Sequence, residues 1–314
     1  MSTATQRILT IAAAQMGPIA RSENRSAVVK RLIELMRQAK AMGAQVVAYP
    51  EATLTAFFPH WWIEDEAEID AWFEREMPGP QTMPLFDEAK RLGIGFHLGY
   101  CELDMSSGRK RRFNSSILVG GDGNIIGKYR KIHLPGHADH RPGTPFQNLE
   151  KRCFEVGDLG FPVWRAWGGV AGMMICNDRR WPEAYRVLGL QGVEMIFCGY
   201  NTPTHHPGAP DHDRLGQFHN ELSMQSGAYQ NSSWVVGVAK AGMEEGVDMI
   251  AGSCIIAPNG EIVARCAGSG DEVIVARCDL DLGRSYRETT FNFALHRRVE
   301  HYGMIVERTG RVAP

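Results

Sequence analysis

Three residues with reactive side chains each come directly after an apolar run that is typical of a buried strand. They are Glu51, Lys131 and Cys176. In a sheet whose strands are joined by crossover helices, functional side chains gather beyond the carboxyl ends of the strands, so these three are predicted to meet. A cysteine thiol becomes a strong nucleophile when a base, a cation or a helix N-terminus favours the thiolate. The lysine ammonium and the backbone N–H of Asn177 could then stabilise the oxyanion of an attacked carbonyl group, which indicates acyl-transfer chemistry.

The elements that must hold these side chains alternate between strands and helices. A strand, a helix and a second strand fill the first fifty residues, which is typical of a parallel sheet built from crossover units. No linker or compositional step divides the chain, so one α/β domain is expected. The predicted strands are residues 8–15, 45–49, 95–103, 115–119, 125–129, 170–175, 195–198, 234–239, 253–256, 261–265 and 273–279. The predicted helices are residues 22–42, 83–92, 181–190 and 211–229.

A short internal similarity suggests that the domain contains two sheets. Residues 116–128 and 253–265 both have the pattern of a strand, a glycine turn and a second strand, and they align at a constant offset. The simpler interpretation is that any strand–turn–strand segment resembles any other. Two similar hairpins in two packed sheets would nevertheless suit a chain of 314 residues.

The charge and hydropathy of the sequence exclude several classes of partner. The 34 Lys and Arg residues nearly cancel the 36 Asp and Glu residues, so no basic field is available for a nucleic acid. The apolar runs fall far short of the roughly 20 residues that cross a bilayer, and the polar start lacks the pattern of a signal peptide. We therefore expect a cytoplasmic protein with a small-molecule partner and no association with nucleic acid or membrane.

Seven cysteines, an odd number, are scattered without a C-x-x-C pair. In a chain long enough to bury a large core, they are expected to be reduced and mostly packed as small apolar side chains. Histidine clusters near residues 133–140 and 205–212 are spaced for a shared zinc ion. Pro135 and Gly136 interrupt any helix that would align the first cluster, and no cysteine pair supports either, so no metal is predicted.

Three segments of the chain resemble, in order, the three signature regions of the nitrilase superfamily. They are residues 49–52 around Glu51, residues 127–136 around Lys131, and residues 175–183 around Cys176. Within that superfamily the sequence is most similar to the N-carbamoyl-D-amino acid amidohydrolases, or D-carbamoylases. This closer resemblance is carried by residues 57–59, 112–114, 176–183 and 199–205, of which the run Asp-Arg-Arg-Trp-Pro-Glu is the most specific part.

The resemblance implies a fold and an assembly. The fold is an αββα sandwich of two mixed sheets flanked by helices, which dimerises into a larger layered core, so a homodimer or homotetramer is expected. Residues 1–280 would form the nitrilase-like hydrolase domain. Residues 281–314 have too little apolar periodicity for a core of their own and would pack on a partner subunit as a C-terminal extension. No metal and no organic cofactor is implied.

The resemblance also assigns catalytic roles. Glu51 would be the general base, Cys176 the nucleophile and Lys131 the oxyanion stabiliser, with Glu150 as a second acid that supports the lysine. The substrate carboxylate would be held by Arg179 and Arg180, because a guanidinium matches a carboxylate with two parallel hydrogen bonds. The alternative for this pair is a surface pair or an ion pair that stabilises the fold.

The remaining residues that the resemblance places in the substrate site are Asn177, Asn201, Thr202 and His133. One position departs from the D-carbamoylases, which carry a histidine where this sequence has Asn148. An asparagine exchanges hydrogen bonds but takes no proton near neutral pH, so any proton-handling role at this position is lost.

The expected reaction is hydrolysis of an N-carbamoyl-D-amino acid to the D-amino acid, carbon dioxide and ammonia through a carbamoyl-thioester intermediate. The same residues could serve a β-ureidopropionase, an N-carbamoylputrescine amidase or an aliphatic amidase. An inactive scaffold or binding subunit is the alternative outside enzymes, and the intact set Glu51, Lys131 and Cys176 argues against it.

Overall fold

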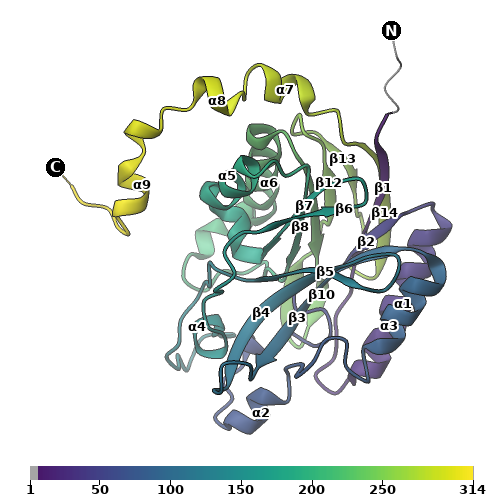
Figure 1. Ribbon diagram of the computed structural model, residues 1–314. Helices are drawn as coiled ribbons and strands as arrows, with labels where there is room; N and C mark the ends of the chain where they lie inside the picture. Colours follow the sequence, from purple (N-terminus) through teal and green to yellow (C-terminus); the bar gives the residue numbers. More distant parts are fainter. Residues whose placement is uncertain (1–5, 314) are drawn as a thin grey trace.

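The computed structural model describes residues 6–313 and has two six-stranded sheets packed face to face (Figure 1). The strands of the first sheet are β1 (Ile8–Gln15), β2 (Val46–Ala48), β3 (Gly95–Asp104), β4 (Arg111–Val119), β5 (Ile125–Arg130) and β14 (Glu272–Asp279). The strands of the second are β6 (Val163–Ala166), β7 (Gly169–Ile175), β8 (Met195–Tyr200), β9 (Trp234–Ala239), β12 (Cys254–Ile256) and β13 (Ile262–Arg265). Their orders are β14-β1-β2-β3-β4-β5 and β13-β12-β9-β8-β7-β6. Both sheets are mixed, because β1–β3 and β7–β9 are parallel while the outer strands pair antiparallel.

Helices cover the outer face of each sheet. The first sheet carries α1 (Arg25–Ala41) and α3 (Met83–Leu92), and the second carries α5 (Pro182–Leu190) and α6 (Gly216–Asn231) (Figure 1). Strand β1 shows why the layers form: Ile11 and Ala13 belong to the core cluster of the second sheet, whereas Ala12 and Ala14 pack with the buried face of α1. Successive side chains of a strand point to opposite faces, so one apolar strand joins both layers. The predicted αββα sandwich is confirmed.

The two similar hairpins lie one in each sheet. Strands β4 and β5 pair antiparallel at an edge of the first sheet, and β12 and β13 do so at an edge of the second. In each sheet three parallel strands, β1–β3 or β7–β9, precede the hairpin, so the two sheets have the same arrangement of strands. The prediction of two similar sheets is therefore correct.

Shorter elements complete the fold, and most of them were not predicted from the sequence. They are the strands β10 (Ala241–Glu244) and β11 (Val247–Ile250), the helices α2 (Glu66–Asp70), α4 (Glu150–Cys153), α7 (Arg284–Glu288), α8 (Phe293–His296) and α9 (Gly303–Glu307), and the 3-10 helices η1 (Phe58–His60), η2 (Cys176–Arg180), η3 (Pro210–Leu215) and η4 (Val299–His301). The helix predicted for residues 211–229 is divided, because η3 precedes α6. All seven cysteines are free and buried, as predicted.

The chain beyond α7 runs as an arm along the outside of the molecule and then away from it (Figure 1, yellow). The arm is anchored by the rings of Tyr286 and Phe291, which pack edge-to-face on Tyr229, and by Phe293, which lies 4.2 Å below the guanidinium of Arg186. None of residues 284–313 is buried. The arm thus lacks a core of its own, and its packing on a partner subunit stays a prediction. Within residues 6–313, no helix has the length and apolar character that a membrane span requires.

Candidate active site

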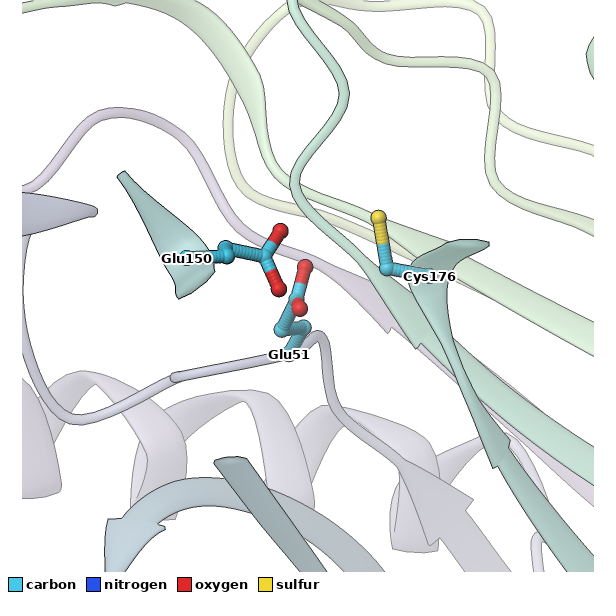
Figure 2. A group of neighbouring side chains, drawn as sticks. All are labelled: Glu51, Glu150 and Cys176. Atoms are coloured by element: carbon cyan, nitrogen blue, oxygen red, sulfur yellow. The ribbon is translucent and has the colours of Figure 1, made fainter. Parts of the chain in front are cut away.

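The structure brings Glu51, Lys131, Glu150 and Cys176 together in the interior. Glu51 follows β2 and Lys131 follows β5 in the first sheet, and Cys176 follows β7 in the second, so the carboxyl ends of strands from both sheets collect the three side chains. Figure 2 shows the carboxyl groups of Glu51 and Glu150 pointing toward each other with Cys176 beside them. Ligand atoms of these three side chains lie within 4.8 Å of one another. The Lys131 ammonium donates to Glu51 Oε1 at 2.8 Å and to Glu150 Oε2 at 2.6 Å.

Two glycines let the Glu51 backbone pass between the sheets. A Cβ atom at Gly199 in β8 would stand 2.5 Å from the Glu51 nitrogen, and one at Gly99 in β3 would stand 2.7 Å from the Glu51 Cα. Real side chains do not approach a backbone this closely, so only glycine fits at either position. The next residue, Ala52, has a φ of 43°, which turns the chain out of the strand direction. The general base candidate is therefore placed by backbone packing on both sides.

The Glu51 carboxylate is held by the predicted site residue Asn201 and by Asn114, to which the sequence assigned no role. Asn114 Nδ2 donates to Oε1 at 2.7 Å, and the backbone N–H of Asn201 donates to Oε2 at 2.8 Å. Asn201 Nδ2 also donates to the Glu51 carbonyl oxygen at 3.0 Å, and the Asn114 carbonyl accepts the Lys131 backbone N–H at 2.8 Å. Asn114 belongs to the segment 112–114 that carries the D-carbamoylase resemblance, which is the signal that could have identified it.

The charges of this cluster favour a neutral Glu150 and a charged Lys131. Burial lowers the pKa of Lys131, but the negative charges of Cys176, Glu150 and Glu51 outweigh it and hold that pKa well above its ordinary value. Burial, partly offset by Lys131 and reinforced by Glu51, raises the pKa of Glu150. Lys131 can consequently act as a hydrogen-bond donor, and Glu150 keeps a proton at a pH where an exposed carboxyl has lost it.

Cys176 begins the turn between β7 and α5 in a strained backbone conformation, with a φ of 47°. Such strain at a non-glycine residue is typical of a nucleophile presented on a sharp turn. Its Sγ lies 3.9 Å from the hydroxyl of Thr202. Burial and then the charge of Glu51 raise the pKa of the Cys176 thiol, while Lys131 and Arg179 lower it. The resting side chain is thus a thiol that needs a base, and Glu51 lies within reach.

Asp178 organises the turn and was not predicted. Its Oδ1 accepts from the His133 backbone at 3.0 Å and lies 2.8 Å from His133 Nδ1, while Oδ2 accepts from Ile175 N at 3.0 Å and the Tyr129 hydroxyl at 2.8 Å. Asn177 Nδ2 donates to the His133 carbonyl at 3.2 Å. The predicted site residues His133 and Asn177 therefore join the lysine-bearing segment to the cysteine turn.

The two arginines have different environments. Arg179 is buried, and its guanidinium donates to Asn220 Oδ1 at 2.7 Å, to the Cys176 carbonyl at 2.7 Å and to Thr202 Oγ1 at 2.9 Å. It lies 4.3 Å over the ring of Tyr200. These contacts use every guanidinium nitrogen, so Arg179 supports the cysteine turn and Thr202 as part of the protein interior.

Arg180 is exposed, and no carboxylate of residues 6–313 forms an ion pair with it. Partial burial of the guanidinium and then the charge of Arg179 lower its pKa. The charges of Cys176 and Glu150 act in the opposite direction. The resemblance assigned the substrate carboxylate to both arginines, whereas the structure buries Arg179 and leaves Arg180 as an exposed cation at the end of the turn.

The histidine clusters do not converge on a metal. His133 is bound to Asp178, His137 Nδ1 lies 2.8 Å from the Asp139 carbonyl, and His140 stacks on Trp62. Within residues 6–313, the group with a metal-like spacing is Glu51, Glu150 and Cys176. The Lys131 ammonium already bridges its two carboxyl groups, so a metal cation there would have to compete with a buried lysine.

Asn148 is the position at which this sequence differs from the D-carbamoylases, and it packs on the turn at Gly136. Its carbonyl accepts the His137 backbone N–H at 2.9 Å, and a Cβ atom at Gly136 would stand 2.1 Å from that carbonyl. The Asn148 Oδ1 atom is buried and has no hydrogen-bond partner within residues 6–313.

A hollow of about 340 Å³ contains two of the predicted site residues, His133 and Asn177, in its lining. It is lined by Ile132, His133, Leu134, Lys151, Phe154, Val156, Asn177 and Trp181. A larger hollow of about 520 Å³ lies around Arg25 and Glu74 and contains none of the predicted site residues.

Comparison with known proteins gives consistent similarities. The carbon-nitrogen hydrolase family matches residues 10–288. A nitrilase of Pyrococcus abyssi is 32% identical over 269 residues, which cover 86% of this chain and 90% of that protein. An N-carbamoylputrescine amidase of Solanum lycopersicum is 29% identical over 293 residues, or 90% of this chain and 89% of its own. The crystal structure of a carbon-nitrogen hydrolase from Helicobacter pylori G27 has the same fold, with a TM-score of 0.81 at 21% identity over 96% of this chain and 99% of that chain.

Proposed function

This chain belongs to the carbon-nitrogen hydrolase family of the nitrilase superfamily, and from that premise we propose that it hydrolyses N-carbamoyl-D-amino acids. The observation that carries the proposal is the guanidinium of Arg180, which ends the 3-10 turn that Cys176 begins and has no ion-pair partner within residues 6–313. A cation that is partly withdrawn from water and lacks an acidic partner favours a ligand with a carboxylate. An N-carbamoyl amino acid supplies that carboxylate next to the ureido group that is to be cleaved.

The same cation argues against a positively charged substrate. N-carbamoylputrescine, which names one of the relatives, ends in an ammonium group, and this would be repelled by Arg180 and by the charge of Lys131. A simple aliphatic amide would leave Arg180 without a partner. The D configuration is supported by the resemblance of residues 176–183 and 199–205 to the D-carbamoylases.

Two buried acceptors beside Glu51 match a substrate that is rich in N–H groups. The Oδ1 atoms of Asn114 and Asn201 have no hydrogen-bond partner within the described part of the chain, although the Nδ2 atoms of both amides are used. An unpaired buried acceptor is costly until a donor reaches it. The ureido group of the proposed substrate carries three N–H bonds, enough for both.

In the first half of the proposed reaction, Glu51 takes the proton of the Cys176 thiol, and the sulfur forms a bond to the ureido carbonyl carbon. Lys131 and the backbone N–H of Asn177 donate to the resulting oxyanion. Glu51 then gives its proton to the departing amino nitrogen as the C–N bond breaks. The product is the D-amino acid and a carbamoyl-thioester on Cys176.

In the second half, Glu51 takes a proton from water as the water oxygen attacks the thioester carbon. The C–S bond breaks, the thiolate recovers its proton, and the released carbamic acid decomposes to carbon dioxide and ammonia. Glu150 holds Lys131 in place by the 2.6 Å hydrogen bond throughout. The opposite order, with ammonia leaving first, uses the same residues.

The test is ammonia release from N-carbamoyl-D-phenylalanine, its L enantiomer and N-carbamoylputrescine, with Cys176→Ala as the blank. We expect release from the D substrate that the Cys176→Ala variant abolishes. Arg180→Gln should lower kcat/KM for the D substrate by about 10- to 100-fold, chiefly through KM, because it removes a charge-assisted pair. Arg277→Gln is the matched control, since Arg277 is also exposed and lies on β14 away from the site.

Each other outcome selects an alternative. Preference for N-carbamoylputrescine, or an Arg180→Gln variant with full activity, would contradict carboxylate recognition. Release from none of the three by a protein with a reactive Cys176 would direct the search to amides and nitriles. Absence of both activity and thiol reactivity would favour a scaffold.

We also propose that the protein is a homodimer or homotetramer. Exposed apolar side chains occur on α5, on α6 and on the C-terminal arm, including Leu190, Phe218, Leu222, Leu295 and Ile305. Such side chains are favourably buried between subunits. Light scattering of the full chain and of a chain ending at residue 283 would test this assembly and the role of the arm.

A further inference from the structure

The hollow of about 340 Å³ is lined by the predicted site residues His133 and Asn177 and by chain neighbours of the catalytic residues. Three of its lining residues are chain neighbours of catalytic residues: Ile132 follows Lys131, Lys151 follows Glu150 and Asn177 follows Cys176. Asn177 also carries the backbone N–H that is proposed to bind the oxyanion. The hollow therefore shares three short chain segments with the catalytic residues.

The walls of the hollow are mainly apolar. Ile132, Leu134 and Phe154 form its inner part, and Val156 and Trp181 stand at its rim with 58% and 46% of their surface exposed. Exposed apolar surface beside a reactive site is favourably covered by an apolar group of a ligand.

The aromatic wall is rigid. The ring of Trp181 stacks on His133 with the ring centroids 5.1 Å apart and the planes 11° apart. His133 is in turn fixed by Asp178, which is fully buried. A wall whose orientation is set before binding costs little entropy when a ligand packs on it.

The charged groups of the hollow are positive. Lys151 is exposed at its edge, and Arg180 directly precedes Trp181 in the chain, whereas none of the lining residues is acidic. The hollow thus combines an apolar interior with cations at its border. This suits a group that is apolar itself and attached close to a carboxylate.

We propose that this hollow binds the side chain of the N-carbamoyl amino acid and selects aromatic and large aliphatic side chains over small ones. The proposal rests on the proposed function, because the side chain and the carboxylate branch from the same carbon atom. With the carboxylate at Arg180 and the ureido carbonyl at Cys176, the third substituent packs between Trp181 and Val156.

The test compares kcat/KM for N-carbamoyl-D-phenylalanine and N-carbamoyl-D-alanine. Val156→Trp fills the hollow, and Trp181→Ala removes its aromatic wall. Each is expected to lower the phenylalanine-to-alanine ratio about tenfold, which is the range for altered apolar contacts in a specificity pocket. Val187→Ser on α5 is the control, because Val187 is 41% exposed and lies outside the hollow. It should leave the ratio unchanged.

The outcomes separate this proposal from the proposed function. If the wild type hydrolyses both substrates and neither hollow variant changes the ratio, the function stands and the hollow proposal is wrong. An equal loss on both substrates also contradicts it. A change of molecular mass in Val156→Trp without a change of ratio would assign the hollow to a subunit contact instead. If the wild type releases ammonia from neither substrate, the proposed function fails and the hollow proposal fails with it.

Discussion

Asn114 Nδ2 lies 2.7 Å from Glu51 Oε1, on the same oxygen that accepts from Lys131. The other oxygen accepts from the backbone of Asn201, so the carboxylate has donors on both sides and cannot rotate freely. Because the Asn114 carbonyl also accepts the Lys131 backbone N–H, one residue aligns the base candidate with the oxyanion donor. Asn114 is in this sense a positioning residue.

Replacing Asn114 with leucine should therefore lower activity by misplacing Glu51. Loss of a hydrogen bond to a charged group costs about 1.5–3 kcal/mol, which corresponds to roughly 10- to 150-fold in rate. We expect the loss chiefly in kcat, with a smaller rise in KM because the Asn114 Oδ1 proposed to accept a ureido N–H is also removed. Steady-state kinetics measure this split, and an effect on KM alone would contradict the positioning role.

The seven thiols should differ in reactivity although all are buried. Burial raises the pKa of Cys153, Cys254, Cys266 and Cys278 to about 12. At Cys176, Lys131 and Arg179 oppose the increase, so its thiolate is the most populated at neutral pH. Iodoacetamide should give a single adduct at Cys176 in the native protein, faster as pH rises.

Mass spectrometry of the labelled peptides identifies the adduct. Cys176→Ser should abolish labelling under native conditions, and Cys266→Ser should not. Lys131→Met removes the cation that lowers the pKa of Cys176, so labelling at a fixed pH should slow. Faster labelling in Lys131→Met would show that Lys131 does not favour the thiolate.

Glu150 should make the protein less stable as the pH rises. Its folded-state pKa is raised by burial, so its stabilising contribution is complete below the ordinary carboxyl pKa and is lost as the pH rises through the raised value. Glu150→Gln imitates the protonated form and should raise Tm relative to the wild type at pH 8, with the difference vanishing near pH 4. Its kcat should fall, because Lys131 loses a carboxyl partner.

Thermal unfolding at both pH values tests this sign. Equal Tm differences at pH 4 and pH 8 would mean that Glu150 has no raised pKa in the folded state. Glu155→Gln is the control, since the pKa of that partly exposed carboxyl is lowered by its arginine neighbours and shifts stability in the opposite direction.

The sequence was informative where a local pattern determines the structure. Glu51, Lys131 and Cys176 could be located because each follows an apolar run and lies at the carboxyl end of a strand. Asn114 lies in β4 just before the predicted strand 115–119, and its contact with Glu51 depends on sheet register. The roles of Gly99 and Gly199 depend on the packing of two sheets. These contacts join residues far apart in the chain.

The different burial of the two arginines also could not be predicted from the sequence. Arg179 and Arg180 are adjacent, and no spacing rule separates the buried one from the exposed one. The outcome depends on the 3-10 turn after Cys176, which directs Arg179 to Asn220 on α6. Strands β10 and β11 were not predicted, because each has only four residues. Two residues of each strand are buried, which is too short a pattern to identify from the sequence.

A second buried ion pair supports the loop that follows Glu51. Lys240 Nζ lies 2.9 Å from Glu244 Oε2 and donates to the Thr55 carbonyl at 2.6 Å. Glu244 accepts the backbone N–H groups of Phe57 at 2.7 Å and Ile19 at 3.0 Å. Both charged side chains are almost completely buried. The pair thereby ties residues 55–57 to the end of β9, a few residues beyond the base candidate.

Lys240→Met should destabilise the fold by about 3–5 kcal/mol, because it leaves Glu244 buried without a counter-charge. The double variant Lys240→Met, Glu244→Gln removes both charges and keeps an acceptor for one of the two N–H groups of Phe57 and Ile19, so it should recover part of that loss. If the pair also positions Glu51, the double variant regains stability in urea unfolding but has a reduced kcat, since Thr55 has lost its donor. A double variant with restored stability and full kcat would limit the pair to stabilising the fold, whereas a kcat defect that persists after stability returns would extend the catalytic framework from β2 to β9.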